Sequence, residues 1–380
     1  MKVAIIHYWF ITRRGGEKVV ESILKIYPDA DIYTLFYDKK SYGRFLNKHN
    51  VSTSVLDTPF LRKHYQKIFP LYPLGIKSLK LKKNYDLIIS SESGPAKGVE
   101  IKDKTPHICY IHSPMRYCWS HTDLYVNTAH PILRPLMRFF LKKLQNWDRR
   151  TVSNVDLYLS NSRNVAKRVK EYYKRRSIVV YPPISDELFT KPLKLNDNKD
   201  IYLSFGAMTP YKRIDLLIDT FNINGKKLII IGGGSEMEKL FNKANDNIEF
   251  KGILEWVKIE KLFSQTRALL FPGEEDFGMI PLEVMAYGIP VIAFRKGGAL
   301  ETVIENKLNI SKSTGLFFDE QNVKSILKSV DYFETVEHKF SPEWIRNHAI
   351  KYNETQFLSN FKTHIEKFLN KNIKGKKITR

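Results

Sequence analysis

The sequence predicts an α/β protein made of two Rossmann-like domains whose parallel sheets face each other across a cleft. Short apolar segments of strand length alternate with amphipathic segments of about ten residues in both halves of the chain. This alternation is typical of parallel sheets that carry helices on both faces. The length of 380 residues suits two domains of ordinary size, each with its own hydrophobic core.

The first half begins with an apolar strand at Val3–Tyr8, a loop that contains Gly15 and Gly16, and a helix from about Glu17 to Tyr27. Apolar residues recur in that helix every three or four positions, which is the helical period. They are Val19, Val20, Ile23, Leu24 and Ile26. Further apolar runs predict strands at Ile32–Phe36, Leu87–Ser90, His107–His112 and Leu157–Ser160.

The second half repeats the alternation. We expect strands at Tyr202–Phe205, Leu228–Ile231, Ile248–Phe250, Ala268–Phe271 and Pro290–Ala293, and helices at Ile214–Phe221, Glu236–Lys243, Trp256–Ser264 and Pro281–Tyr287. The polar, proline-containing stretch Pro182–Asp200 is typical of an inter-domain linker. The predicted domains are therefore 1–185 and 186–350, followed by a basic helix and tail at 351–380 that could pack back on the first domain.

The chain is strongly basic, and its charge is unevenly distributed. It has 62 Lys and Arg against 40 Asp and Glu, a formal net charge of +22. Residues 1–190 carry +17, residues 191–350 carry −1, and the last 30 residues carry +6. Such an excess indicates an anionic partner. With 43% hydrophobic and 27% charged residues, the composition excludes a disordered or collagen-like chain.

Cysteine content and hydropathy favour a cytoplasmic protein. Only Cys109 and Cys118 occur, too few for a disulfide framework and without the spacing of a metal site, so we expect reduced thiols. No apolar run approaches the roughly 18 residues of a membrane-spanning helix. The segment Met1–Trp9 leads into no small-residue cleavage site and is expected to form a strand rather than a signal peptide.

Ligands of open α/β sheets bind beyond the carboxyl ends of the strands, where helix N-termini offer free N–H groups. Four segments follow predicted strands in this way: Gly15-Gly16, His112, Gly232-Gly233-Gly234 and the stretch Gly273–Gly278. A glycine pair at such a place is most often only a tight turn, so each segment alone is weak evidence for a ligand site.

Charged residues near two of these segments indicate a phosphate-bearing ligand. Lys212 and Arg213 open a predicted helix, where cations oppose the helix dipole unless an anion is bound. We therefore expect a phosphate between them and the amides of Phe277–Met279. Glu283 lies one turn into an apolar helix and needs a hydrogen-bonding partner, either the hydroxyls of a ribose or a structural salt bridge.

The sequence offers little support for a metal or an ATP-hydrolysing site. Asp29-Ala30-Asp31 has the Asp-x-Asp form, but it lies at the start of a strand, and a solvated turn is the favoured interpretation. The ten histidines have no zinc-binding spacing, and no Gly-x-x-x-x-Gly-Lys-Ser/Thr loop is present.

The second half resembles the nucleotide-sugar domain of retaining glycosyltransferases with the GT-B fold, specifically family 4. The matching stretches are SFGAMTPYKRIDLLIDTF, LIIIGGGSEMEKL, IEFKGIL and ALLFPGEEDFGMIPLEVMAYGIPVIAFRKGGALETV. In the first half, GGEKV, HSPMRYCW, DLYLSNSRNVAKRV and VVYPPI also fit. The motifs MTPYKR, HSPMRYCW and GEEDFG look closest to mannosyltransferase-like members of bacterial surface-polysaccharide biosynthesis.

This resemblance implies an acceptor-binding domain at 1–185 and a nucleotide-sugar-binding domain at 186–350. His112, Lys212 and Glu275 would be catalytic, and Glu283 would bind the nucleotide ribose. The other donor-binding residues that it implies are Gly15, Gly16, Arg213, Gly233, Gly252, Ile253, Phe277, Gly278 and Met279. Many members have Arg where this chain has Ala207, and we expect Arg213 to supply the missing charge beside Lys212.

The implied reaction is transfer of a hexose, with mannose favoured, from a nucleotide-diphospho sugar such as GDP-mannose to a growing, lipid-linked oligosaccharide. The resemblance implies retention of configuration, no metal, and a place in surface polysaccharide, lipopolysaccharide or O-antigen synthesis. One alternative is a GT-B-fold epimerase that acts on the nucleotide sugar alone. Another is a basic nucleic-acid-binding protein, but no reader motif is recognisable.

The basic first half also suggests a membrane partner. Residues 60–83 and 132–150 interleave Lys and Arg with aromatic and aliphatic residues. Such segments could lie on an anionic inner leaflet, or they could be ordinary amphipathic helices packed on the sheet. A lipid-linked acceptor on such a membrane would account for the charge better than nucleic acid. We therefore expect a cytoplasmic protein, peripheral to the inner face of the cytoplasmic membrane.

Overall fold

The structure is a computed structural model that describes residues 1–101, 104–127, 129–193 and 199–378, with the backbone alone for 372–378. The chain divides into two compact units. Unit 1 comprises Met1–Pro183 and Thr355–Arg380, and unit 2 comprises Ile184–Glu354. Unit 1 has 40 Lys and Arg against 15 Asp and Glu, a net charge of +25, while unit 2 has 22 against 25. The whole basic excess therefore belongs to unit 1.

Unit 1 is built on a seven-stranded sheet with the strand order β3-β2-β1-β4-β5-β6-β7, and every pair is parallel. The strands are β1 (Val3–Phe10), β2 (Asp31–Tyr37), β3 (Val51–Thr53), β4 (Leu87–Glu92), β5 (His107–Ile111), β6 (Leu157–Ser160) and β7 (Ser177–Val179). The central strands are buried along almost their whole length, as expected for a parallel sheet covered on both faces. The order reverses between β1 and β4, which makes this pair the topological switch point of unit 1.

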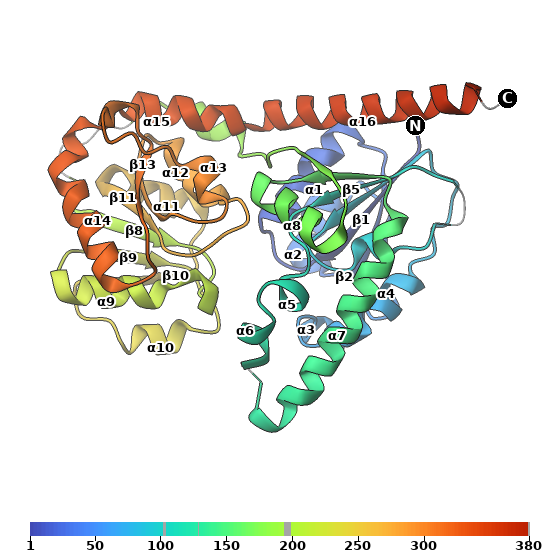
Figure 1. Cartoon of the computed structure of the whole chain (residues 1–380), viewed down its shortest axis with the longest axis horizontal. Helices are drawn as coiled ribbons and strands as arrows, with labels where there is room; N and C mark the ends of the chain where they lie inside the picture. The colour runs from blue at the N-terminus through green and yellow to red at the C-terminus, as the bar shows by residue number, and fades with distance from the viewer. Residues whose placement is uncertain (102–103, 128, 194–198, 379–380) are drawn as a thin grey trace. The chain divides into compact units, whose positions relative to one another are not determined.

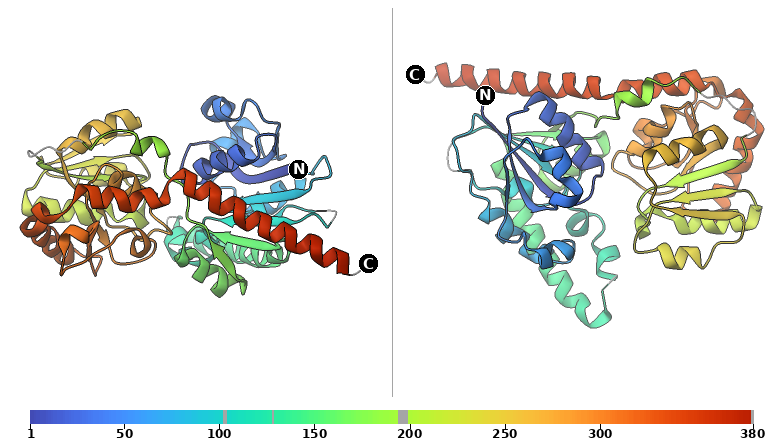
Figure 2. Two further views of the ribbon diagram at one scale, coloured as in Figure 1. Left: turned by 90° about the horizontal axis from the view of Figure 1, so that it is seen from above. Right: turned by 180° about the vertical axis from the view of Figure 1, so that it is seen from behind.

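Helices pack on both faces of this sheet. They are α1 (Gly15–Ile26), α2 (Lys39–Leu46), α3 (Pro59–Lys63), α4 (Tyr72–Ser78), α5 (Arg116–Trp119), α6 (Thr122–Asn127), α7 (Arg134–Arg150), α8 (Arg163–Tyr173) and α16 (Glu354–Ile378). On one face, Val19 of α1 shares a core cluster with Ile5 of β1 and Phe361 of α16, and Figure 2 shows α16 running across unit 1. On the other face, Ile6 of β1 clusters with Ile76 of α4. The N-terminal end of α7 projects away from the sheet, with α6 beside it (Figure 1).

Unit 2 is built on a six-stranded parallel sheet with the order β10-β9-β8-β11-β12-β13. The strands are β8 (Ile201–Phe205), β9 (Leu228–Ile231), β10 (Ile248–Gly252), β11 (Thr266–Phe271), β12 (Val291–Phe294) and β13 (Gly315–Phe318). The helices are α9 (Ile214–Asn224), α10 (Met237–Phe241), α11 (Trp256–Leu262), α12 (Met279–Met285), α13 (Ala299–Thr302), α14 (Val323–Val336) and α15 (Pro342–Ala349). The order reverses between β8 and β11, so the switch point of unit 2 lies there.

The predicted α/β class with two Rossmann-like domains is confirmed. Every predicted strand is present, with bounds that differ by at most two residues, while β3, β7 and β13 were not expected. Asp31 does not lie in a solvated turn, as the sequence had suggested, because Asn50, Lys83 and Tyr85 donate hydrogen bonds to its buried carboxylate. Both cysteines are buried free thiols. Within the part of the chain that is described, no helix combines the length and the apolar composition needed to span a membrane.

Candidate functional site

The loops that follow β8 and β11 meet at the switch point of unit 2. Lys212, in the loop after β8, forms an ion pair with Glu275, in the loop after β11. Both side chains are 15% exposed. A cation and a carboxylate that solvent can still reach therefore lie where open α/β sheets bind their ligands. The structure thus brings together two of the predicted catalytic residues.

A hollow of about 330 Å³, open solvent included, adjoins Lys212. Gly206, Ala207 and Phe271 contribute to its lining. In the same loop, the Thr209 hydroxyl is buried and has no hydrogen-bond partner among the described residues. A buried hydroxyl without a partner is costly, so this hydroxyl marks the loop beside the hollow as a place where a hydrogen-bonding group is missing. No pattern in the sequence had singled out Thr209.

Arg213 has an unusual backbone and a paired side chain. Its φ of +55° lies in the left-handed region, which non-glycine residues rarely adopt. It separates a 3₁₀ turn at Pro210–Lys212 from α9, so Lys212 does not open the helix as expected. The guanidinium Nε and Nη2 donate to the two carboxylate oxygens of Asp215 at 3.1 and 3.2 Å. The charge of Arg213 is thus shared with Asp215 in this structure.

The loops after β9 and β10 hold the predicted residues Gly233, Gly252 and Ile253. The Gly232 amide donates to the Gly252 carbonyl at 2.8 Å. A Cβ on Gly232, whose φ is +137°, would lie 1.9 Å from the Gly206 carbonyl oxygen, so this close approach requires glycine. Ile253 is 86% exposed, and a Cβ on Gly233 would touch its Cγ1 at 3.4 Å. The exposed isoleucine therefore provides an apolar surface beside Gly233 on which a flat ligand can pack.

The acidic loop before α12 is fixed by the rest of unit 2. The Glu275 carbonyl accepts a hydrogen bond from the Gly298 amide at 2.8 Å. The Phe277 side chain is buried, with its ring 5.8 Å from that of Tyr352, so any contact of Phe277 with a ligand would be made by its backbone. Helix α12 begins at Met279, two residues earlier than expected, and Gly278 precedes it directly. Of the predicted Phe277–Met279 segment, Met279 is therefore the first residue of the helix, and Phe277 and Gly278 lie just before it.

Glu283 is one turn into α12 and only 7% exposed, among buried apolar neighbours. A carboxylate so deeply buried needs a hydrogen-bonding partner. Its contact with a ribose stays a prediction.

In unit 1, the predicted residues Gly15, Gly16 and His112 lie at the carboxyl ends of β1 and β5. Gly15 and Gly16 are the first residues of α1, and His112 follows β5 directly. A Cβ on Gly16 would lie 2.5 Å from the Tyr8 hydroxyl oxygen and 3.6 Å from His112 Nε2. The helix N-terminus and the histidine therefore face the same small region, and a methyl group on Gly16 would displace the Tyr8 hydroxyl.

His112 is held by the last two residues of β4. Its backbone N–H donates to the Glu92 carbonyl at 2.8 Å, and its Nε2 lies 2.8 Å from Ser91 Oγ. Ser91 Oγ also lies 3.0 Å from His7 Nδ1 on β1. Sequence reasoning missed both His7 and Ser91, because they lie inside strands, where a polar side chain gives no periodic signal.

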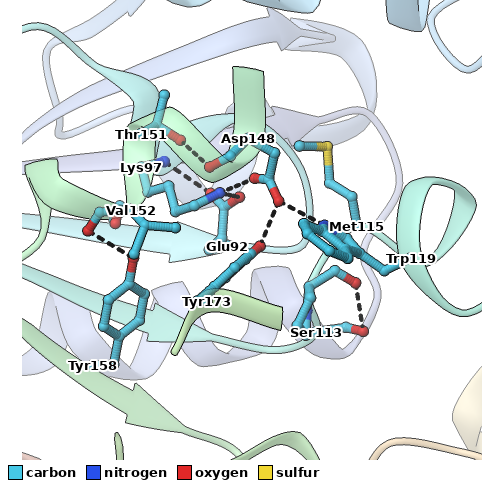
Figure 3. Close-up of polar contacts among 12 residues, drawn as sticks. Glu92, Lys97, Ser113, Met115, Trp119, Asp148, Thr151, Val152, Tyr158 and Tyr173 are labelled. Atoms are coloured by element: carbon cyan, nitrogen blue, oxygen red, sulfur yellow. Dashed lines mark hydrogen bonds and ion pairs between the residues drawn. The ribbon is translucent and has the colours of Figure 1, made fainter. Parts of the chain in front are cut away.

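A buried ionic network centred on Lys97 lies next to Glu92, the last residue of β4 (Figure 3). Lys97 forms ion pairs with Glu92 and Asp148, and the three side chains are at most 1% exposed. Trp119 Nε1 and Tyr173 Oη each donate to Asp148 Oδ2 at 2.8 Å. Burial raises the pKa of Glu92 to about 7, although the nearby Lys97 acts against this rise. The network connects the segment after β4 with α5, α7 and α8, and it therefore supports the loop that carries His112.

Comparisons with known proteins agree with this geometry. Residues 14–188 match the family described as Glycosyltransferase Family 4, and residues 185–354 match Glycosyl transferases group 1. An uncharacterized glycosyltransferase of Methanocaldococcus jannaschii is 28% identical over 80% of this chain and 82% of its own length. The human alpha-1,3/1,6-mannosyltransferase ALG2 is 26% identical over 64% of this chain and 66% of its own length. The crystal structure of Anabaena HepE in complex with UDP has a TM-score of 0.71, with 16% identity, over 97% of this chain and 100% of that one.

The two parallel-sheet domains and the likeness to HepE show the GT-B fold. The two family matches together run from residue 14 to residue 354, and they are more specific than the fold. The chain belongs to the family 4 type of glycosyltransferases, as the resemblance of its motifs had indicated.

Proposed function

We propose that this glycosyltransferase moves mannose from GDP-mannose to a growing, lipid-linked oligosaccharide, with retention of configuration, in surface polysaccharide or O-antigen synthesis. The observation that carries the transferase chemistry is the Lys212–Glu275 ion pair at the switch point of unit 2. The choice of mannose is supported by the likeness to ALG2, whose name gives it as a mannosyltransferase.

The reaction develops negative charge on the leaving diphosphate and positive character on the sugar, so the enzyme must stabilise the first and orient an acceptor for the second. Lys212 has three N–H donors, and it can keep Glu275 while it also binds a phosphate oxygen. The amides of Phe277–Met279, at and just before the first residue of α12, would donate hydrogen bonds to the diphosphate. In this proposal no metal is needed, because the lysine and the amides supply the positive charge.

The remaining predicted residues take the other parts of the donor. Glu275 can accept a hydrogen bond from a sugar hydroxyl on the oxygen that is not paired with Lys212. Glu283 would accept hydrogen bonds from the ribose hydroxyls. The base would pack on Ile253, which is exposed beside Gly233. In unit 1, His112 would contact the sugar, and Gly15 and Gly16 would let the substrate approach the backbone of α1. Arg213 would add its charge if the diphosphate replaces Asp215 as its partner.

A donor screen tests this function most simply. Thermal unfolding is followed with GDP-mannose, GDP, UDP-glucose and UDP, each at increasing concentration. A ligand at 100 times its Kd stabilises the folded state by about 2.7 kcal/mol, so we expect GDP-mannose and GDP to raise the Tm clearly and the uridine compounds to do little. A response to uridine compounds alone would refute the choice of donor.

Product analysis separates the transferase from the epimerase. With GDP-mannose and a lipid-linked oligosaccharide, we expect an extended glycan whose new linkage has the anomeric configuration of the donor by NMR, and unchanged yield in EDTA. Conversion of the donor to an isomer without any acceptor would instead support an epimerase.

We also propose that unit 1 lies on an anionic membrane at the cytoplasmic face, where a lipid-linked acceptor would be found. Unit 1 carries +25, and apolar side chains are exposed on the projecting end of α7 and on the 3₁₀ turn Pro131–Leu133 that precedes it. Ile132, Leu136 and Phe139 are 80, 53 and 52% exposed, and Lys143 Nζ lies 4.4 Å from the centre of the Phe139 ring. Apolar groups that can insert beside cations are the pattern of an interfacial helix.

Sedimentation with liposomes tests the membrane proposal. Wild-type protein should bind vesicles that contain anionic lipid and not neutral ones, and Leu136→Glu with Phe139→Glu should abolish the binding. Leu308→Glu is the matched control, because Leu308 is 100% exposed in unit 2. Equal binding of wild type to neutral and anionic vesicles would contradict the proposal.

A further inference from the structure

A continuous row of polar groups runs through the interior of unit 1 from α1 to His112. His7 and Ser91 stand opposite each other in the parallel pair β1–β4, at the switch point. Ser91 Oγ lies 3.0 Å from His7 Nδ1 and 2.8 Å from His112 Nε2. At the other end of the row, His7 Nε2 lies 3.7 Å from Glu17 Oε1. His7, Glu17 and Ser91 are almost completely buried.

The hydroxyl of Ser91 couples the two imidazole rings. It has one proton to donate, and two ring nitrogens are its hydrogen-bond partners. When Ser91 donates to one ring, the other ring must donate to Ser91 Oγ. For neutral rings, the hydrogen therefore cannot be on both His7 Nδ1 and His112 Nε2, and the tautomer of one ring determines that of the other.

Glu17 determines the direction of the hydrogen bonds along this row. Its Oε2 accepts a hydrogen bond from the Arg14 amide at 3.0 Å, while its Oε1 and His7 Nε2 are both buried without a hydrogen-bond partner among the described residues. A carboxylate favours an N–H over a bare nitrogen as its neighbour, so the hydrogen of His7 belongs on Nε2. His7 Nδ1 then accepts from Ser91, and Ser91 accepts from His112 Nε2–H.

We propose that Glu17, His7 and Ser91 are positioning residues that hold His112 in its Nε2–H tautomer. Nδ1 of His112 is then a hydrogen-bond acceptor, which suits a hydroxyl group as its partner. The contact with a sugar hydroxyl rests on the proposed function, whereas the tautomer of His112 does not. The three positioning residues act through His112 and do not themselves touch the sugar.

The tautomer is measured directly by ¹⁵N NMR of the histidine rings, with assignment by single His→Gln variants. In the wild-type chain we expect a protonated Nε2 and a bare Nδ1 for both His7 and His112. Glu17→Gln places an amide N–H near His7 Nε2. This change reverses the direction of the hydrogen bonds from His7 through Ser91 to His112, and it moves His112 toward the Nδ1–H tautomer. Glu21→Gln is the matched control on the same helix, since Glu21 binds Arg13 and Tyr42 instead. It should leave His112 unchanged.

A second variant tests the coupling without relying on the first. In a Ser91→Ala background, Glu17→Gln should no longer change the His112 spectrum, because the connecting hydroxyl is absent. The proposal is overturned if wild-type His112 carries its hydrogen on Nδ1, if His7 is protonated on both nitrogens, or if Glu17→Gln shifts His112 equally with and without Ser91.

Turnover distinguishes the row from the proposed function. Glu17→Gln is expected to raise KM or lower kcat for GDP-mannose about tenfold, the size of one lost hydrogen bond of about 1.4 kcal/mol, and Glu21→Gln should do neither. If Glu17→Gln reverses the His112 tautomer and leaves the kinetics unchanged, the control of the tautomer by Glu17 is supported and the sugar contact of His112 is refuted. If Glu17→Gln does not change the tautomer, the control by Glu17 is refuted whatever the kinetics show.

Discussion

Replacement of Lys97 by methionine should destabilise unit 1, because it leaves two carboxylates in the interior without their cation. Removing one partner of a buried ion pair typically costs about 3 to 5 kcal/mol. Two features of the network reduce this cost: Asp148 keeps its hydrogen bonds from Trp119 and Tyr173, and Glu92, whose pKa is raised to about 7 by burial, can take up a proton. We therefore expect about 3 kcal/mol near neutral pH, and more at higher pH, where protonation of Glu92 no longer relieves the charge.

Amide hydrogen exchange followed by mass spectrometry measures this effect within unit 1 alone. About 3 kcal/mol corresponds to roughly hundredfold faster exchange in peptides of β4 and β5. Lys142→Met is the matched control, because Lys142 is an exposed lysine of the same helix, α7, as Asp148, and it should change exchange by less than threefold. Equal exchange of β4 in the two variants would refute the reasoning that Lys97 compensates buried charge.

Because the pKa of Glu92 is higher in the folded chain than its usual value of 4.5, the folded state holds the proton more tightly, and stability falls as pH rises from about 5 to 7. Glu92→Gln cannot titrate, so the free energy of unfolding of this variant, relative to that of the wild type, should increase between about pH 5 and pH 7. A difference that stays constant would contradict the raised pKa of Glu92. Gly16→Ala should weaken activity at least tenfold, since its Cβ would meet the Tyr8 hydroxyl at 2.5 Å; normal kcat/KM would show that the site tolerates the change. Ile253→Asp should weaken GDP binding about tenfold by calorimetry, because it removes apolar surface worth roughly 1 to 2 kcal/mol. An unchanged affinity would refute the prediction that the base packs on Ile253.

The sequence predicted the elements that have strong local signals. Strands such as β9 are short apolar runs bounded by glycine or polar residues, and their position and parallel arrangement follow from that pattern. The three-residue strands β3 and β7 were missed because they are too short for any periodicity and are defined only by pairing at the sheet edges.

The candidate site was predictable only in part, for a physical reason. The charge pattern identified Lys212 and the resemblance identified Glu275, but their ion pair depends on the strand order, which places the loops after β8 and β11 side by side. The pairing of Arg213 with Asp215 depends on local geometry that residue spacing does not encode, and so does the Thr209 hydroxyl, which lacks a partner within the described parts of the chain. The partners of His112 were hidden for a similar reason, since they come from two other strands.

The division of charge also became sharper with the structure. Residues 1–190 gave +17 in the sequence, and the return of α16 to unit 1 raises the charge of that unit to +25. Lys212 and Arg213 lie in unit 2, whose net charge is −3. Because each of these two cations is paired with a carboxylate, the excess available to a polyanionic surface lies in unit 1.

The turnover of Lys212→Ala tests the central claim most directly, because that claim places the leaving diphosphate beside Lys212. Loss of one preorganised donor costs about 3 kcal/mol in the transition state, so kcat for transfer from GDP-mannose should fall roughly a hundredfold. Circular dichroism should show an unchanged fold, and the control Lys243→Ala, an exposed lysine of unit 2 paired with Asp219, should keep wild-type turnover. A kcat for Lys212→Ala close to that of the control would contradict the account.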